Sequence, residues 1–236
     1  MRLGVIVPVP TLDLAGLRKR ENAYAQCALK STEVHVTKTE GGPESTDSRY
    51  EEILAGPHII SCAEKLASED LSALILSCFG DPSVGALREI YDFPVVGPGE
   101  ASIFTASNLG DRFSIITILP NGISMIRERV QQFGLTERLA SIRAINVNPG
   151  HLDFQTEHVK SALLEQGNAA IEIDDASVLV VGCTSPEIAM AAVDMSRALG
   201  VPVVNPIAAA VNTAESLVKQ NLKNSRRTYV KPLSRP

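Results

Sequence analysis

The sequence has no long apolar run and no excess of basic residues, and both absences limit the partners that the protein can have. No stretch approaches the roughly 20 apolar residues that a membrane helix requires. The apolar start, residues 1–8, is too short for a signal-peptide core. Lys and Arg number 22 against 27 Asp and Glu, a net charge of −5, whereas nucleic acids and anionic membranes attract basic patches. We expect a cytoplasmic protein whose main partner is neither a nucleic acid nor a membrane.

The motifs of cofactor and metal sites are also missing. There is no GxGxxG, no Walker loop and no cluster of metal ligands, so we predict neither a dissociable cofactor nor a metal ion. The four cysteines, Cys27, Cys62, Cys78 and Cys183, form no CxxC pair, which predicts free thiols in a reducing compartment. The partner class that remains is a small molecule, and the sequence leaves homo-oligomerisation open.

Short β-branched runs alternate with longer amphipathic segments, which is typical of an α/β protein. Nearly continuous apolar strands separated by helices indicate parallel sheets covered by helices on both faces. The pattern falls into two similar halves. We predict strands at 2–7, 34–37, 73–77 and 94–97 in the first half and at 112–118, 141–147, 177–182 and 202–205 in the second.

Each half carries a cysteine at the same place. The run ALILSC at 73–78 matches VLVVGC at 178–183, and each cysteine directly follows a strand. Ligands of open parallel sheets bind at the carboxyl ends of the strands, where both thiols are predicted to stand. If the halves face each other about a pseudo-twofold axis, the sulfurs of Cys78 and Cys183 meet across one cleft.

Two opposed thiols suit the inversion of a carbon that carries an acidic hydrogen. This reaction needs a base on one face of the carbon and an acid on the other. A thiolate is accessible because the pKa of a cysteine, normally near 8.5, falls beside a helix N-terminus. The turns after the cysteines could cradle a carbonyl, enolate or carboxylate oxygen. The candidates in these turns are Phe79, Gly80, Asp81, Thr184 and Ser185.

Several fragments around these positions follow one another in a recognisable order. They are SCFGDP at 77–82, PVVG at 94–97, RFSIIT at 112–117, GCT at 182–184 and AAAV at 208–211. In this order they resemble the aspartate/glutamate/hydantoin racemase superfamily, and within it the hydantoin and allantoin racemases. The similarity extends over about residues 1–220.

The resemblance implies two flavodoxin-like domains with the active site between them, no cofactor, and Cys78 and Cys183 as the acid/base pair. It also implies that the C-terminal helix returns to the first domain. The expected domains are therefore 1–97 with 206–236, and 98–205. We predict that the basic tail from Lys223 onward is a loose end.

The resemblance favours proton transfer at C5 of a 5-substituted hydantoin or an allantoin-like ureide. The chain departs from the hydantoin-racemase pattern at residues 8–11, where Pro-Val-Pro-Thr replaces Asn-Pro-Asn-Thr. Hydroxyl groups that could contact the substrate belong to Thr11, Ser45, Thr117 and Thr184.

Other functions stay open at this point. Relatives of this superfamily isomerise maleate by cysteine attack, decarboxylate malonates with one cysteine as proton donor, or racemise aspartate and glutamate. Two cysteines argue against the single-cysteine decarboxylase. A non-catalytic small-molecule sensor that reuses the cleft is an alternative of another class.

Overall fold

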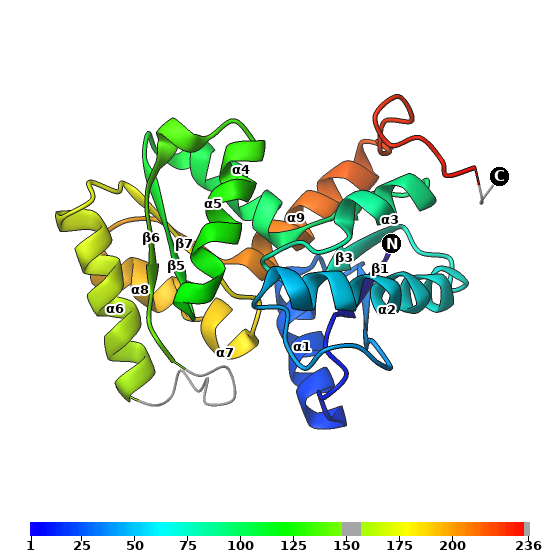
Figure 1. Ribbon diagram of the computed structural model, residues 1–236, viewed down its shortest axis with the longest axis horizontal. Coiled ribbons are helices and arrows are strands. Elements are labelled where there is room, and N and C mark those ends of the chain that lie inside the picture. Colours follow the sequence, from blue (N-terminus) through cyan, green and yellow to red (C-terminus); the bar gives the residue numbers. More distant parts are fainter. Residues whose placement is uncertain (148–156, 234–236) are drawn as a thin grey trace. The chain divides into compact units, whose positions relative to one another are not determined.

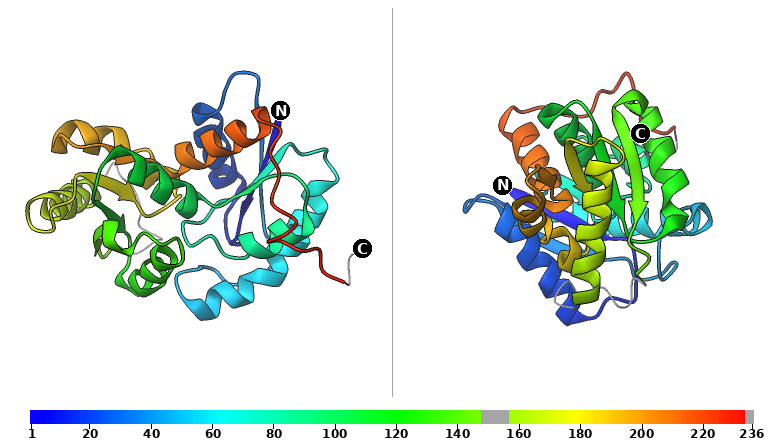
Figure 2. Two further views of the ribbon diagram at one scale, coloured as in Figure 1. Left: turned by 90° about the horizontal axis from the view of Figure 1, so that it is seen from above. Right: turned by 90° about the vertical axis from the view of Figure 1, so that its left-hand side faces the viewer.

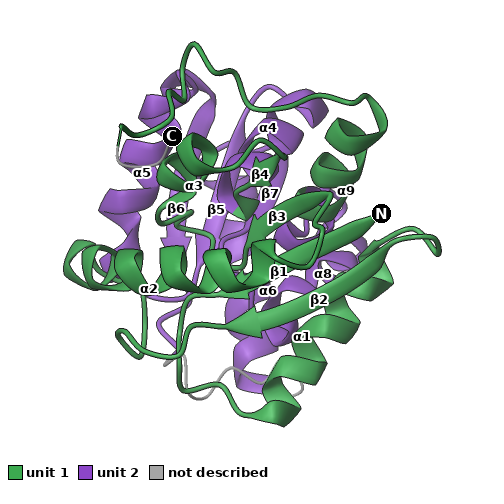
Figure 3. Ribbon diagram, turned by 90° about the vertical axis from the view of Figure 1, so that its right-hand side faces the viewer, with its two compact units in different colours: residues 1–98, 210–236 green, residues 99–209 purple. Residues whose placement is uncertain are grey.

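The structure is a computed structural model that describes residues 1–147 and 157–233. The chain forms two compact units, coloured separately in Figure 3. Unit 1 comprises residues 1–98 and 210–236, and unit 2 comprises residues 99–209. Within the described ranges, no helix is long and apolar enough to cross a membrane.

Unit 1, whose strands β1 and β3 are labelled in Figure 1, is built on a four-stranded parallel sheet. Its order, β2-β1-β3-β4, can be followed in Figure 3. Its elements are β1 (Arg2–Val7), α1 (Leu14–Cys27), β2 (Glu33–Lys38), α2 (Arg49–Ala67), β3 (Ala73–Leu76), α3 (Val84–Ile90), β4 (Val95–Val96) and, from residue 210 onward, α9 (Pro206–Lys219). Every residue of β3 is buried, as the continuous apolar run predicts for a central strand. Helix α2 buries Ile59 and Leu66 in one cluster with Ile6 and Leu76 of the sheet.

Unit 2 repeats this plan with a parallel sheet in the order β6-β5-β7-β8. Its elements are α4 (Pro98–Leu109), β5 (Phe113–Thr117), the 3₁₀ helix η1 (Pro120–Gly122), α5 (Ile123–Gln132), η2 (Thr136–Arg138), β6 (Leu139–Ala144), α6 (Glu157–Glu172), β7 (Val178–Val181), α7 (Pro186–Ala189), α8 (Ala192–Leu199) and β8 (Val203–Val204). Val159 and Leu163 of α6 and Met195 of α8 join Leu179 and Val181 in the core. Figure 2 shows helices on both sides of each sheet.

The two sheets agree in strand order and also in register. The first strand of each sheet pairs with the third, Ile6 opposite Leu76 in unit 1 and Ile116 opposite Val181 in unit 2. The predicted fold class, two similar α/β halves with parallel sheets covered by helices, is confirmed. One predicted strand was misplaced, because β6 ends at Ala144 and not at residue 147.

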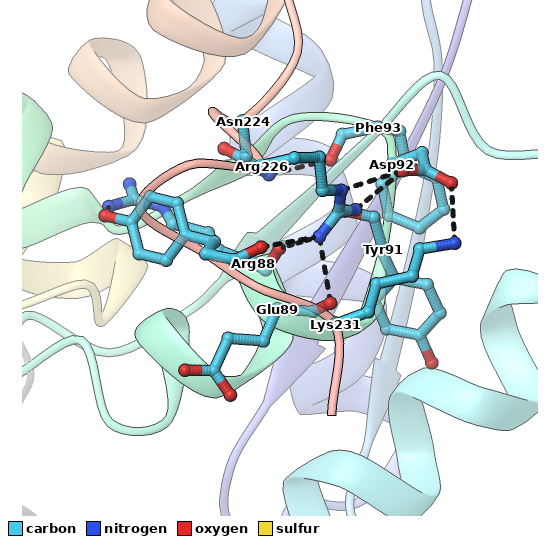
Figure 4. Close-up of polar contacts among 9 residues, drawn as sticks. Arg88, Glu89, Tyr91, Asp92, Phe93, Asn224, Arg226 and Lys231 are labelled. Carbon is cyan, nitrogen blue, oxygen red and sulfur yellow. Dashed lines mark hydrogen bonds and ion pairs between the residues drawn. The ribbon is translucent and has the colours of Figure 1, made fainter. Parts of the chain in front are cut away.

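The prediction of a loose C-terminal tail is wrong. Figure 4 shows the Arg226 guanidinium at the C-terminal end of α3, where it donates to the carbonyl oxygens of Arg88 (3.0 Å), Glu89 (2.9 Å) and Tyr91 (2.5 Å). It also bonds the carboxylate of Asp92 at 2.7 Å. The last carbonyl groups of a helix have no partner within the helix. An arginine that satisfies two of them, and that of the residue capping the helix, orders its own segment.

Candidate active site

Cys78 lies at the carboxyl edge of the unit 1 sheet, two residues beyond the end of β3. The preceding residue, Ser77, still donates its N–H to the carbonyl oxygen of Ile6 at 2.7 Å. The chain then turns, and the Asp81 N–H donates to the Cys78 carbonyl oxygen at 3.1 Å. Asp81 has a φ of +50° in this turn, which shows that the loop after the cysteine is tightly bent.

The carboxylate of Asp81 is buried against Gly97, the residue that follows β4. A Cβ atom on Gly97 would lie 2.3 Å from the Asp81 carboxyl carbon, far inside van der Waals contact. The side chains of both Asp81 and Phe79 are buried. The cysteine loop is therefore packed against the end of the neighbouring strand, and only a glycine at position 97 permits this approach.

Polar groups from α2 and from the loop that precedes it surround the Cys78 sulfur. The Oγ1 atom of Thr46 lies 3.2 Å from Sγ. A Cβ atom on Gly80 would lie 2.6 Å from Oε1 of Glu52 and 3.7 Å from the sulfur, so this carboxylate and the thiol converge on Gly80. Neither Thr46 nor Glu52 is among the site residues predicted from the sequence. Thr46 could have been found as the hydroxyl residue next to Ser45, in the loop after the second strand.

The expectation that a helix N-terminus lowers the pKa of this thiol is wrong for Cys78. Burial raises the pKa of the Cys78 thiol to about 12, and the carboxylates of Glu52 and Asp81 act in the same direction. Hydrogen bonds from Thr46 and from the Gly80 N–H oppose the rise. Helix α3 begins only at Val84, six residues after the cysteine. The described surroundings favour the protonated thiol.

Two further predicted residues of unit 1 lie on loops at the same edge of the sheet. Ser45 donates its hydroxyl to Oε1 of Glu51 at 2.8 Å, so its first partner is a protein carboxylate. Thr11 is exposed on the loop after β1. This is the loop in which the chain lacks the asparagines of the hydantoin-racemase pattern. Lys38 holds this loop by donating to the carbonyl oxygens of Pro10, at 2.7 Å, and Leu12.

Cys183 occupies the matching position in unit 2, two residues beyond the end of β7. Gly182 donates its N–H to the Ile116 carbonyl oxygen at 2.8 Å, as Ser77 does to Ile6 in unit 1. The Ser185 N–H donates to the Cys183 sulfur at 3.3 Å. A backbone donor of this kind stabilises a thiolate.

The other predicted residues of unit 2 gather at the same sheet edge. Thr117 ends β5, the strand beside β7, and Thr184 follows Cys183; both are buried. Ser185 immediately precedes α7 and donates its hydroxyl to Oε2 of Glu187 at 2.5 Å. In each unit the predicted residues thus lie at the carboxyl ends of the strands. Over the described part of the chain, no group of three or more His, Cys, Asp or Glu side chains could hold a metal ion.

Comparisons with known proteins agree with this arrangement. The model of the family Asp/Glu/Hydantoin racemase matches residues 14–214. A hydantoin racemase of Pseudomonas sp. (strain NS671) is 34% identical over 235 residues, which cover 98% of this chain and 92% of the relative. The structure of allantoin racemase from Klebsiella pneumoniae matches with a TM-score of 0.91 at 27% identity, over 99% of this chain and 94% of that one. The structure of allantoin racemase from Pseudomonas fluorescens matches with a TM-score of 0.89 at 29% identity, over 99% and 97%.

These similarities make the protein an isomerase with a racemase-type activity. The chain belongs to the Asp/Glu/hydantoin racemase family.

Proposed function

We propose that this enzyme racemises a 5-substituted hydantoin or an allantoin-like ureide by moving a proton between the substrate carbon and two thiols, those of Cys78 and Cys183. The supporting observation is their equivalence. Leu76 and Val181 are equivalent, because each pairs with the penultimate residue of the first strand of its sheet. Each cysteine follows its equivalent residue by two positions. One acid/base group from each unit is what a two-base racemase requires.

The proposed reaction conserves protons and electrons. A thiolate removes the C5 proton, which forms an S–H bond and leaves the electron pair on the substrate as an enolate. The other cysteine then gives its thiol proton to the opposite face of the same carbon and becomes the thiolate. Burial and nearby carboxylates favour the thiol form of Cys78, and a backbone N–H faces the sulfur of Cys183. We therefore assign Cys78 as the proton donor and Cys183 as the base of the first half-reaction.

The substrate class rests on the chemistry of the carbon acid and on the named relatives. The C5 hydrogen of a hydantoin is flanked by a neutral amide carbonyl, which accepts the charge of the carbanion better than a carboxylate does. A cofactor-free thiolate is then a sufficient base. The relatives in question are a hydantoin racemase and two allantoin racemases.

The turns at the two cysteines are the proposed cradle for the substrate oxygens. Backbone N–H groups in such turns can stabilise a developing enolate. The proposed contacts are the backbone N–H of Phe79 and the hydroxyls of Thr11, Thr117 and Thr184. The N–H groups of Gly80 and Ser185 bond the two cysteine sulfurs and that of Asp81 bonds the Cys78 carbonyl oxygen, so these residues shape the turns around the substrate. Ser45 would contact the substrate from the loop before α2, where its hydroxyl is bonded to Glu51.

Isotope exchange and optical rotation test the proposal together. The purified enzyme is incubated in D2O below pH 8 with single enantiomers of 5-substituted hydantoins, allantoin, aspartate and glutamate, each with an enzyme-free blank. Achiral maleate is tested in parallel, with its conversion to fumarate followed by NMR. We expect inversion with deuterium incorporation for a hydantoin or for allantoin. Cys78→Ser and Cys183→Ser should each lose inversion by about 10²–10⁴-fold, the usual contribution of a general acid or base. Each single variant should still exchange the proton of one enantiomer without inverting it.

Cys27→Ser is the matched control, because Cys27 lies within α1 as an ordinary half-buried thiol. It should racemise like the wild type. Normal inversion by either active-site variant would refute the two-thiol reaction. Turnover of aspartate, glutamate or maleate alone would refute the substrate class, and binding without exchange would identify a sensor.

A further inference from the structure

The Cys78 sulfur has a side-chain hydroxyl as a partner, contributed by a loop far away in the sequence. Thr46 Oγ1 lies 3.2 Å from Sγ, within hydrogen-bond distance for sulfur, and either atom can be the donor. Thr46 belongs to the loop 39–48, between β2 and α2. The contact therefore joins this loop to the carboxyl edge of β3.

The loop holds Thr46 from both sides. Glu51, in the first turn of α2, accepts the Ser45 hydroxyl on Oε1 and the Ser48 hydroxyl on Oε2, each at 2.8 Å. Ser48 also caps α2 by accepting the Glu51 N–H at 3.2 Å. One carboxylate thus ties residues on both sides of Thr46 to the helix, and this fixes the path along which the threonine reaches the thiol.

We propose that Thr46 is a positioning residue for Cys78: its hydroxyl turns to donate to the sulfur whenever Cys78 becomes a thiolate, and so fixes its direction and stabilises its charge. A hydroxyl can do this because it accepts from a thiol and donates to a thiolate without moving its oxygen. The proposal rests on the proposed function, in which Cys78 alternates between the two forms.

Other groups that face the sulfur in unit 1 disfavour a thiolate, so a hydrogen-bond donor is needed to stabilise its charge. Glu52 from α2 and Asp81 from the cysteine's own loop are carboxyl groups that oppose a thiolate, and the phenol of Tyr24 on α1 lies within its electrostatic range. The Gly80 N–H is the second donor. Thr46 therefore supplies one of two donors against two acidic groups. Its loss should raise the pKa of the Cys78 thiol and slow every turnover.

The test measures the thiol separately from the reaction. Iodoacetamide alkylation of Cys78 is followed against pH by peptide mass spectrometry in the wild type, Thr46→Val and Thr46→Ser. Below about pH 9 the alkylation rate of Cys78 is proportional to its small thiolate fraction. Removing the hydroxyl in T46V should raise the pKa by about one unit, the scale of a hydrogen bond to a charged group, and so slow alkylation about tenfold at each pH. T46S should titrate like the wild type. For the enantiomer whose proton Cys78 removes, kcat/KM should fall about tenfold in T46V, with its acidic limb displaced to higher pH, and should recover in T46S.

Thr37→Val is the matched control. Burial raises the pKa of the Cys62 thiol, and the Thr37 hydroxyl opposes this rise, so the pair reproduces the hydroxyl–thiol relation on the same unit. T37V should change the titration of Cys62 and leave that of Cys78 as in the wild type. An unchanged Cys78 titration in T46V, or a T46S variant as impaired as T46V, would overturn the proposal. Since alkylation needs no turnover, failure of the proposed racemisation appears separately, as normal inversion by Cys78→Ser.

Discussion

Gly97→Ala tests how tightly the Cys78 loop is packed. The new Cβ would lie 2.3 Å from the carboxyl carbon of Asp81 and 2.5 and 2.6 Å from its two oxygens. Ordinary carbon contacts are about 3.5–4.0 Å, so the two groups must separate by more than about 1 Å. Asp81 is 3% exposed, its side chain is short, and its φ is +50°. It can yield only if the turn after Cys78 moves.

We expect Gly97→Ala to lower the free energy of unfolding by about 1–3 kcal/mol, the range for overpacking a buried site. It should also reduce kcat/KM, because the displaced turn carries the thiol. Urea unfolding followed by circular dichroism gives the first quantity, and racemisation gives the second. Gly85→Ala is the control: no atom lies within 4 Å of its new Cβ, and alanine within helix α3 should gain about 0.5–1 kcal/mol.

A double-mutant cycle locates the clash. Asp81→Ala removes the three atoms that lie nearest to the Gly97 substituent. The double variant should therefore lose less free energy of unfolding than the two single variants lose in sum. The difference should be about the cost of the clash. A Gly97→Ala enzyme with wild-type stability and activity would refute the reasoning, as would strict additivity of the two changes.

Two other predictions concern anchors outside the cysteine loops. Arg226→Gln should release the C-terminal tail and lower the free energy of unfolding by about 1–3 kcal/mol, because glutamine cannot reach the helix carbonyls and Asp92 together. Trypsin should then cleave faster at Lys223 and Arg227, and unchanged cleavage would contradict the prediction. Arg143 bonds both carboxylate oxygens of Asp174, at 2.6 and 3.0 Å, and these bonds hold the pKa of Asp174 below its usual range. A depressed folded-state pKa gives stability that is present above the unfolded value of about 3.9 and lost as the pH falls below it. Arg143→Gln should therefore be less stable than the wild type in urea at pH 7, with the difference shrinking below about pH 4; a constant difference contradicts the assignment.

The strands and the matched cysteines could be predicted from the sequence because both depend on short, continuous patterns. The four residues that form β3 and the four that form β7 are all apolar, and the burial of these strands follows from that. Their position at the carboxyl edge follows from parallel pairing.

The missed features depend on contacts between distant residues. Nothing near Thr46 in the sequence shows that its hydroxyl reaches a sulfur 32 residues later. Arg226 lies 138 residues from Arg88, whose carbonyl group it binds. From the sequence alone, an arginine in a polar tail is expected to be solvent-exposed. The pKa of Cys78 was predicted in the wrong direction because the sequence shows the next helix but neither the burial of the thiol nor the carboxylates beside it.

The lysine that secures residues 8–12 has a consequence for how this enzyme can change. Lys38 grips the segment through the main-chain oxygens of Pro10 and Leu12, and every amino acid carries such an oxygen. The path of the segment is thereby independent of the side chains displayed along it. Substitutions at Val9 and Thr11 therefore leave both bonds of the lysine in place, and the segment can vary in sequence while it keeps its path.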